Sequence, residues 1–414
     1  MSQKLVVVIG AGVVGASVAL SLQRDGHNVT VIDRSGPAAG ASFGNAGAIV
    51  NGSCAPTAMP GIVRDVLRMM LRPLPPLSIR AAYLPRILPW LLRFAAASRR
   101  SRVNQIATDL HALTATAVEA WRELSKGTSL DALLATGGWL KVYETEASFT
   151  ATATARELLD AAGTPYELLA AGDIQDLEPH LAPIYRRAIW QSDGLRIVNP
   201  GRMVEEMVRL LAAGGGIFQL GDVSAVEPDA DGASVRLTDG ATLRADRVVV
   251  AAGAWSRPLA QALGDRIPLD TERGYHLMLP AGTEALLGRT VLNADHSFVL
   301  SPMETGLRMT SQVELAGVEA PPDYRRIRSL LPLAKRMLPA VDASEASVWM
   351  GCRPSLPDSL PVIGRCGRSP NVIYAFGHQH LGMTLGPVTG RLIADLVAGR
   401  SPRLDLSPYR PDRW

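Results

Sequence analysis

Three glycines directly behind an apolar run constrain the fold of this chain more than any other feature. Gly10, Gly12 and Gly15 follow the β-branched segment 5–9, and apolar positions then recur at helical spacing over 13–24. In this G-x-G-x-x-G pattern the first glycine makes a tight turn, the second lets the backbone approach a pyrophosphate, and the third allows close helix packing. We therefore predict a strand, a turn and a helix whose free N–H groups point at phosphates.

An acid at the end of the next predicted strand strengthens this interpretation. Residues 28–32 read as a second buried strand, which ends at Asp33, where an acid would bind ribose hydroxyls. The βαβ unit therefore predicts a dinucleotide site. Arg34 would suit NADP, whereas two small-residue segments, 40–47 and 248–256, favour the flat ring system of FAD. Each of these segments is equally compatible with a simple tight turn.

The composition limits the remaining possibilities. With 47% hydrophobic and 20% charged residues the chain is typical of a folded globular protein, and its 414 residues predict two lobes. The net charge of +3, without a basic stripe interleaved with aromatic residues, argues against nucleic acid as a partner. Cys54, Cys352 and Cys366 show no metal-ligand spacing, so we expect neither a disulfide framework nor a metal site. We expect a cytoplasmic protein, because no signal-peptide core forms before the glycine turn.

Local signals predict several further elements. They are a helix over 106–124, a helix over 151–162, a helix with Asn199 as its N-cap, a hairpin turning at Asp239-Gly240, and an antiparallel sheet within 267–345.

Six motifs spread along the chain give it a resemblance to a known family. They are Gly10 to Gly15 with Asp33, Ala41 to Gly47, Val249 to Ser256, Glu272 to His276, Gly351 to Pro354 with Asp358 to Gly364, and Phe376 to Pro387. This set resembles the glycine oxidase and D-amino acid oxidase superfamily of FAD enzymes, and within it the bacterial D-amino acid dehydrogenases. The motifs are specific for the superfamily and much less so for substrate.

The resemblance implies an extended FAD. It assigns Asp33 to the adenosine ribose, Gly12 to the pyrophosphate, the backbone of Val223 to the adenine, and Asn45 and the 381–384 loop to the flavin. The full set of expected cofactor-binding residues is Gly10, Gly12, Val13, Val14, Gly15, Asp33, Arg34, Ala41, Ser42, Asn45, Ala46, Gly47, Val223, Ala252, Gly253, Leu381, Gly382, Met383 and Thr384.

Arg353 is the first candidate for binding the substrate, because its planar guanidinium can hold a carboxylate through two parallel hydrogen bonds. A structural salt bridge is the alternative. His296 and His380 occupy positions that face the substrate in similar enzymes, although either could be a packing residue. Tyr275 could donate its hydroxyl to substrate or simply cap a sheet. We expect hydride transfer from Cα to flavin N5 without an essential side-chain base.

The predicted fold is α/β (α+β), with a Rossmann-like FAD-binding domain and a discontinuous substrate domain built on an antiparallel sheet plus helices. The expected division gives residues 1–57, 191–266 and 346–414 to the FAD-binding domain. Residues 58–190 are a helical insertion with part of the substrate domain, and 267–345 form its sheet.

The segment 61–102 is strongly basic. It holds one acid, Asp65, and the arginines 64, 68, 72, 80, 86, 93, 99, 100 and 102. Arg64, Arg68 and Arg72 predict a polar helix stripe, and a basic amphipathic helix can lie on an anionic membrane surface. Packing against the substrate lobe explains the same pattern. Peripheral contact with the inner face of the cytoplasmic membrane would suit a quinone acceptor.

The favoured function is oxidation of a D-amino or cyclic imino acid, with D-proline or a hydroxyproline isomer as the preferred substrate and a quinone-type electron acceptor. The alternatives are a glycine or sarcosine oxidase that uses oxygen, and a flavin-binding subunit without catalysis of its own.

Overall fold

The computed structural model describes residues 3–62, 66 and 77–414. One of its layers is a six-stranded sheet of order β10 (Ile217–Leu220), β2 (Asn28–Asp33), β1 (Leu5–Ile9), β14 (Arg247–Val250), β21 (Val372–Phe376) and β20 (Val362–Arg365). All neighbours pair in parallel except β20, which runs antiparallel to β21. The predicted βαβ unit is confirmed, because β1 and β2 are adjacent parallel strands joined by α1 (Val13–Arg24).

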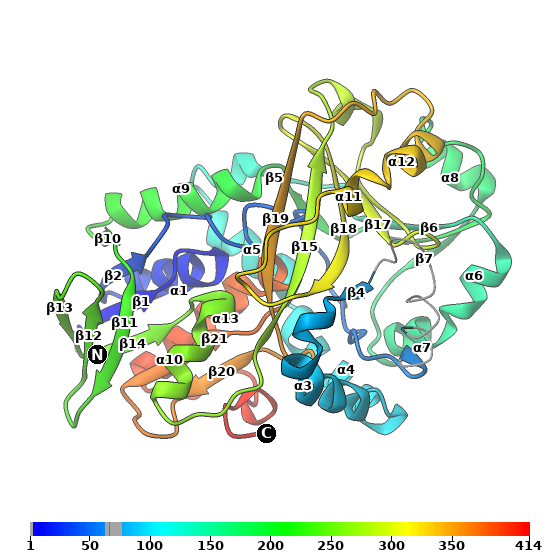
Figure 1. Ribbon diagram of the computed structural model, residues 1–414. Helices are drawn as coiled ribbons and strands as arrows, with labels where there is room; N and C mark the ends of the chain where they lie inside the picture. Colours follow the sequence, from blue (N-terminus) through cyan, green and yellow to red (C-terminus); the bar gives the residue numbers. More distant parts are fainter. Residues whose placement is uncertain (1–2, 63–65, 67–76) are drawn as a thin grey trace.

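Helices cover this sheet (Figure 1). Helix α13 (Gly382–Ala398), near the end of the chain, packs along α1, and α9 (Pro200–Ala213) lies on the other side of α1. The close approach of α13 depends on Gly386 and Gly390, because a Cβ there would lie 2.8 Å from Ser17 Oγ and 2.5 Å from Ser21 Oγ. The predicted cap of α9 is confirmed, since the Asn199 side chain accepts a 3.1 Å hydrogen bond from the backbone of residue 202.

A three-stranded antiparallel sheet flanks the nucleotide layer. It consists of β11 (Val223–Pro228), β12 (Ala233–Leu237) and β13 (Thr242–Ala245). The hairpin predicted at Asp239-Gly240 joins β12 to β13, and Gly240 adopts φ +91°, which glycine tolerates best. The Asp239 carboxylate accepts a 2.9 Å hydrogen bond from the Ala241 N–H, which closes the turn.

A nine-stranded sheet forms the second layer. Along it lie β19 (Ser347–Ser355), β15 (Asp270–Met278), β18 (Gly306–Leu315), β17 (Phe298–Met303), β16 (Thr290–Asn293), β6 (Trp139–Tyr143), β8 (Arg187–Gln191) and β7 (Glu167–Ala170), with β4 (Leu77–Ile79) paired to β18. Most pairs are antiparallel, as predicted for 267–345, while β6–β16 and β4–β18 are parallel. Three short strands, β3 (Ala48–Ile49), β9 (Leu195–Ile197) and β5 (Leu134–Ala135), form a further sheet.

The remaining helices surround the large sheet and the region between the layers. They are α3 (Leu84–Ala97), α4 (Arg100–Thr114), α5 (Ala117–Ser125), α6 (Glu146–Ala151), α7 (Ala153–Ala161), α8 (Ala171–Leu177), α10 (Ser256–Ala262), α11 (Arg325–Arg328) and α12 (Leu331–Met337). The helix predicted over 106–124 is two helices, α4 and α5. Asn51 Oδ1 accepts a 3.1 Å hydrogen bond from the Val118 N–H, so a side chain from elsewhere in the fold satisfies the first turn of α5.

Two features bear on the predicted organisation. Residues 347–355, which the sequence assigned to the FAD-binding domain, form β19 and pair with β15 in the nine-stranded sheet. The division into domains stays a prediction. The helix predicted around Arg64, Arg68 and Arg72 lies outside the described residues. Within the described ranges, no helix has the length and apolar character needed to cross a bilayer.

Candidate active site

The glycine turn opens a cavity of about 370 Å³ at the carboxyl ends of β1, β2 and β14. Gly10 adopts φ +109°, and a Cβ there would lie 2.8 Å from the carbonyl carbon of Ala251. Gly15 touches the Gly10 carbonyl so closely that any side chain would collide with it. The turn is therefore tight enough to bring the N-terminal end of α1 to the cavity, as a phosphate-binding turn requires.

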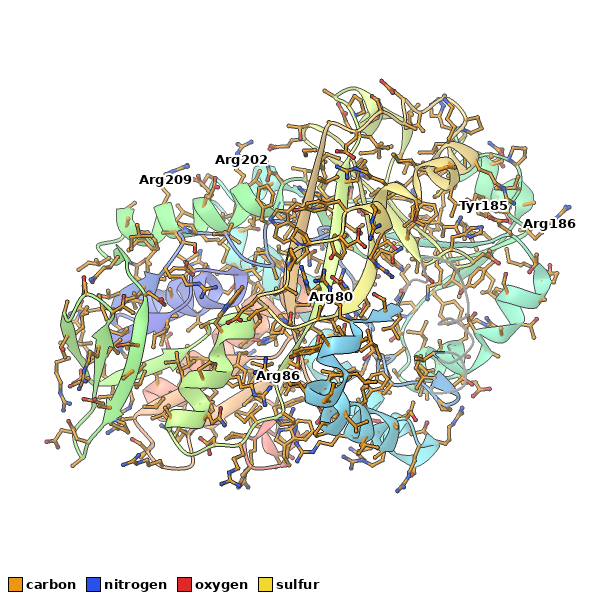
Figure 2. All side chains as sticks on the ribbon, in the orientation of Figure 1. Arg80, Arg86, Tyr185, Arg186, Arg202 and Arg209 are labelled. Carbon is orange, nitrogen blue, oxygen red and sulfur yellow. The ribbon has the colours of Figure 1, made fainter. Side chains whose placement is uncertain are left out.

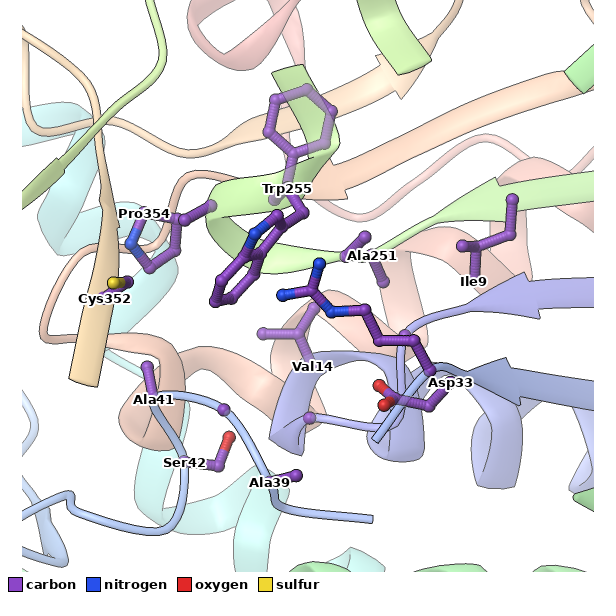
Figure 3. Close-up of a pocket in the computed structure, with 18 of the residues that line it drawn as sticks. Ile9, Val14, Asp33, Ala39, Ala41, Ser42, Ala251, Trp255, Cys352 and Pro354 are labelled. Carbon is purple, nitrogen blue, oxygen red and sulfur yellow. The ribbon is translucent and has the colours of Figure 1, made fainter. Parts of the chain in front are cut away.

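Asp33 stands at one side of this cavity, with Cys352 and Pro354 at the other (Figure 3). Its Oδ2 accepts a 2.8 Å hydrogen bond from the Ala11 N–H, while Oδ1 accepts from Ser35 N at 2.8 Å and Gly36 N at 3.1 Å. The carboxylate thus ties the glycine turn to the loop after β2. Oδ2 accepts a single hydrogen bond and keeps a second lone pair for a ligand, so this role is compatible with binding ribose.

Arg34 and Trp255 form part of the same wall. The Arg34 guanidinium lies 3.9 Å from the centre of the Trp255 ring, a cation–π contact within the cavity lining. Burial raises the pKa of the neighbouring Cys352 thiol, which keeps it protonated and unreactive. The contact gives Arg34 a structural partner independent of any phosphate.

The loop 39–47 closes the cavity against the large sheet. Ser42 Oγ accepts a 2.9 Å hydrogen bond from the Val13 N–H, and Arg308 donates to the carbonyl oxygens of Phe43 and Asn45 at 2.9 and 2.8 Å. Asn45 Oδ1 in turn accepts a 2.8 Å bond from Gly47 N. Desolvation lowers the pKa of Arg308 to about 10, and the guanidinium still remains a cation at neutral pH.

An aromatic group packs on this loop. The rings of His276 and Trp349 stack with centroids 5.3 Å apart, and Phe43 contacts both. Gly44 lies so close to Trp349 that a larger residue would collide with the indole. Desolvation, followed by the Arg308 charge, lowers the pKa of His276 to about 3, so His276 is a neutral packing residue.

A second cavity, of about 470 Å³, lies against the nine-stranded sheet. It shares Ala41, Asn45 and Gln379 with the first cavity, so the two spaces meet at these residues. Gln379 has φ +49°, and its Nε2 donates a 2.9 Å hydrogen bond to the Leu356 carbonyl. Its Oε1 is buried and has no hydrogen-bond partner in the part of the chain that the structure describes. A buried acceptor at the junction indicates a missing donor, which fits a ligand spanning both cavities.

Arg353 enters the second cavity from β19. Its guanidinium lies against the backbone of Gly274, and Nη1 donates a 3.3 Å hydrogen bond to the Gln312 carbonyl. Gln312 adopts φ +72° where the β15–β18 register shifts, and this bulge turns its carbonyl towards the arginine. Glu272, the register partner of Arg353, also lines the cavity.

Glu272 and Arg353 each counteract the pKa shift that burial causes in the other. Burial raises the pKa of Glu272, and the Arg353 charge acts in the opposite direction. Burial lowers the pKa of Arg353, and Glu272 counteracts this. A guanidinium with open donors beside a single carboxylate is suited to hold the carboxylate of a small acid.

The other predicted substrate residues have different surroundings. His380 lines the second cavity, and desolvation together with the Arg353 charge lowers its pKa to about 4. Tyr275 lines it too, but its hydroxyl donates to Glu314 and accepts a 3.1 Å bond from Asp323 N, so it serves the sheet. His296 does not line either cavity, and its Nε2 lies 3.2 Å from Glu144 Oε1. The structure therefore brings His380, and not His296, next to Arg353.

Most of the predicted cofactor-binding residues line one of the two cavities. Those that line the first are Gly10, Gly12, Val13, Val14, Asp33, Arg34, Ala41, Ser42, Asn45, Val223, Ala252, Gly253, Gly382 and Met383. Those that line the second are Ala41, Asn45, Ala46, Leu381 and Thr384. Gly15 and Gly47 line neither, and each instead meets backbone, Gly15 at the Gly10 carbonyl and Gly47 at the Ile197 carbonyl.

Comparison with known proteins decides the family. A family model described as FAD dependent oxidoreductase (DAO) matches residues 6–396. The chain belongs to this family. It is an FAD-dependent oxidoreductase, and the two joined cavities fit its elongated cofactor.

Relatives extend along the whole chain. A D-amino-acid oxidase of Bradyrhizobium diazoefficiens is 34% identical over 416 residues, which cover 99% of this chain and 98% of that protein. A D-amino acid dehydrogenase of Allorhizobium ampelinum is 30% identical over 417 residues, covering 99% and 98%. The crystal structure of glycine oxidase from Geobacillus kaustophilus superposes with a TM-score of 0.74 at 23% identity, covering 100% of both chains. This likeness shows the shared fold.

Several residues of the site were not predicted. Trp255, Glu272, Gly274 and Gln379 lie within the six motifs, but the motifs predict no role for any of them. Lys141 of β6, which also lines the second cavity, gave no sequence signal. The strand alternation of 139–143 could have placed Lys141 opposite its apolar neighbours, but not in a particular cavity.

Proposed function

We propose that this protein oxidises a D-amino acid or cyclic imino acid at its Cα atom. The observation that supports this is the position of the Arg353 guanidinium, inside a cavity that joins the nucleotide cavity at Ala41, Asn45 and Gln379. The D configuration rests on the names of the relatives, which are 30–34% identical along the whole chain.

The chain's residues have distinct tasks in this reaction. FAD, when bound, supplies the oxidant that accepts a hydride from the substrate Cα. Arg353 holds the carboxylate and so fixes the direction of Cα, an orienting effect that can be worth several orders of magnitude in rate. Desolvation, followed by the Arg353 charge, lowers the pKa of His380, which favours its neutral form beside Arg353. Because the amine must lose its proton before it can form an imine, Glu272 beside Arg353 is placed to take up that proton.

The test uses the purified flavoprotein under anaerobic conditions. Absorbance of the oxidised flavin is followed while D- and L-amino acids, glycine, sarcosine, D-proline and D-hydroxyproline are added in turn. We expect D-amino or cyclic imino acids to bleach the flavin. The Arg353→Ala variant should keep its yellow colour and lose bleaching, whereas Arg403→Ala, at an exposed position, should behave as the wild type. Normal bleaching of Arg353→Ala would contradict the proposal, and so would a flavin that no amino acid reduces.

The electron acceptor separates two versions of this function. We propose a quinone-type acceptor. Turnover in air with stoichiometric hydrogen peroxide would instead support an oxidase of the glycine or sarcosine type. If the protein binds flavin but none of the tested substrates reduces that flavin, it would be a non-catalytic subunit.

Contact with a membrane surface is a second proposal, and helix α3 supports it. Leu84, Leu88 and Leu92, spaced four residues apart, have exposed fractions of 45%, 48% and 64%. The opposite face buries Ile87 and Trp90 against β18. Helix α3 therefore has one apolar face packed on the protein and another turned to solvent.

The charges near α3 match an anionic surface. Arg86, labelled in Figure 2, lies on α3 with Arg93, and Arg99 and Arg102 follow; all four are exposed without an ion pair in the described chain. Leucines with arginines beside them are typical of a helix lying in a membrane interface. We expect co-sedimentation with phosphatidylglycerol vesicles at low salt, reduced in Leu88→Glu/Leu92→Glu and unchanged in Leu220→Glu, whose position on β10 is 65% exposed. Equal sedimentation of all three proteins would contradict this surface.

A further inference from the structure

Lys141 is a cation in the second cavity that the proposed reaction does not use. Its strand alternates: Trp139 and Lys141 line the cavity, while Leu140 and Val142 are buried in the core on the other face of the sheet. The pleat of β6 therefore fixes the Lys141 side chain on the cavity face.

Among the described residues, no group offsets this charge. The Lys141 side chain makes no hydrogen bond or ion pair with any residue of the described chain. Glu272 is the single acid among the described residues that line the cavity, and the cation that acts on it is Arg353. Desolvation lowers the pKa of Lys141, and the positive charge of Arg156 lowers it further. Lys141 is partly exposed towards the cavity, and a partly desolvated ammonium group without a counter-ion among the described residues is a favourable partner for an anion that enters.

The register of the sheet places Lys141 relative to the carboxylate site. Lys141 pairs with Leu292, Leu292 with Val299, and Val299 with Thr310, so one row crosses from β6 to β18. Three strand spacings separate the ends of this row by roughly 14 Å. The Arg353 guanidinium contacts β18 at Gln312, two residues from Thr310.

The surface between the two cations suits a short aliphatic chain. Leu292 and Val299, both in the cavity lining, present apolar side chains in the row that leads to Lys141. A substrate held at Arg353 can lay methylene groups over them, and the flexible lysine side chain can reach back to meet its far end.

We propose that Lys141 binds a second carboxylate at the end of the substrate side chain, so that acidic D-amino acids of about the length of D-glutamate are preferred. This inference rests on the proposed function, because the α-carboxylate is assigned to Arg353. A compact substrate such as D-proline does not reach Lys141.

The experiment compares matched ligands with and without the second charge. Glutarate and pentanoate are titrated calorimetrically into the holoenzyme, and D-glutamate and D-glutamine are compared in anaerobic flavin reduction. Lys141→Met removes the charge at similar length, Lys141→Arg keeps it, and Lys126→Met controls for loss of an exposed lysine. We expect Lys141→Met to weaken glutarate and D-glutamate binding by about tenfold or more. Pentanoate, D-glutamine and D-proline should be unaffected, and Lys141→Arg should restore most of the loss.

The results separate this inference from the proposed function. Equal affinity of wild type and Lys141→Met for glutarate would overturn it, as would a wild type reduced equally well by D-glutamate and D-glutamine. If Lys141→Met does not fold, the wild-type comparisons of charged and uncharged ligands decide the question. If no D-amino acid reduces the flavin, the proposed function fails, and any charge-dependent glutarate binding then points to a different dicarboxylate ligand.

Discussion

Replacing Gly274 with alanine tests the carboxylate site without touching the residue that forms it. A Cβ at position 274 would lie 2.7 Å from Arg353 Nε and closer still to two other guanidinium atoms, whereas ordinary contacts are 3.4–4 Å. The guanidinium must therefore move by at least roughly 1 Å. A displacement of this size at a positioning group can cost about a hundredfold in rate.

The fold should tolerate the same change. The colliding atoms belong to the end of a flexible side chain rather than to backbone, so Arg353 can move while β15 and β19 keep their register. We expect Gly274→Ala to retain its flavin. Its free energy of unfolding should lie within about 1–2 kcal/mol of the wild-type value. The anaerobic reduction rate with the best D-amino acid should fall by about a hundredfold.

The control is Gly172→Ala in α8, where an added Cβ meets nothing within 4 Å. The flavin of this variant should be reduced at the wild-type rate. Its stability should be unchanged or slightly increased, because alanine favours the helical conformation more than glycine does. Flavin absorbance in a stopped-flow instrument measures reduction, and urea unfolding measures stability. A Gly274→Ala protein with wild-type reduction and wild-type affinity for carboxylate ligands would refute the placement of Arg353 at the substrate.

Three further predictions concern the cofactor site and the effect of pH. Residue 10 has φ +109°, and Gly10→Ala places a Cβ 2.8 Å from the backbone of Ala251. We therefore expect the variant to lose its flavin and about 2 kcal/mol or more of stability, seen as a colourless protein with a lower melting temperature. A yellow variant of normal stability would contradict this. Asp33→Ala leaves three backbone N–H groups without their acceptor and should weaken flavin binding at least tenfold by fluorescence titration, while an unchanged affinity would limit Asp33 to the loop. His276 and His378 are buried, and desolvation lowers the pKa of each to about 3, so the unfolded chain binds protons that the native state cannot. Native stability should therefore fall as pH decreases from about 6.5 towards 3, by roughly 1.4 kcal/mol per pH unit for each histidine; urea titrations at pH 7 and 5 that show no loss, or a loss that His378→Gln does not reduce, would contradict it.

Local signals in the sequence predicted much of the nucleotide layer. The glycine turn, the Asn199 cap and the Asp239-Gly240 hairpin each depend on residues a few positions apart, and all three are present in the structure. Such features are set by backbone conformation and short hydrogen bonds, which a pattern of residue types records.

The contents of the second cavity depend on strand register instead. Lys141 and Arg353 face one space because five strand pairings connect β6 to β19, and no short pattern records those pairings. For the same reason the sequence could not separate His380, which lines the cavity, from His296, which pairs with Glu144. The break between α4 and α5 likewise depends on Asn51, a residue more than sixty positions away.

The order of strands in the six-stranded sheet has a consequence for how the enzyme is made. β1 lies between β2 and β14 in this sheet. Strand β21 and helix α13 come from the last fifty residues of the chain, and α13 packs on α1, which is near the start of the chain. A nascent chain still on the ribosome therefore holds the glycine turn without the helix that supports it. Loading of the cofactor must await synthesis of almost the whole polypeptide, and a prematurely terminated product would leave an apolar face of α1 for chaperones and proteases to recognise.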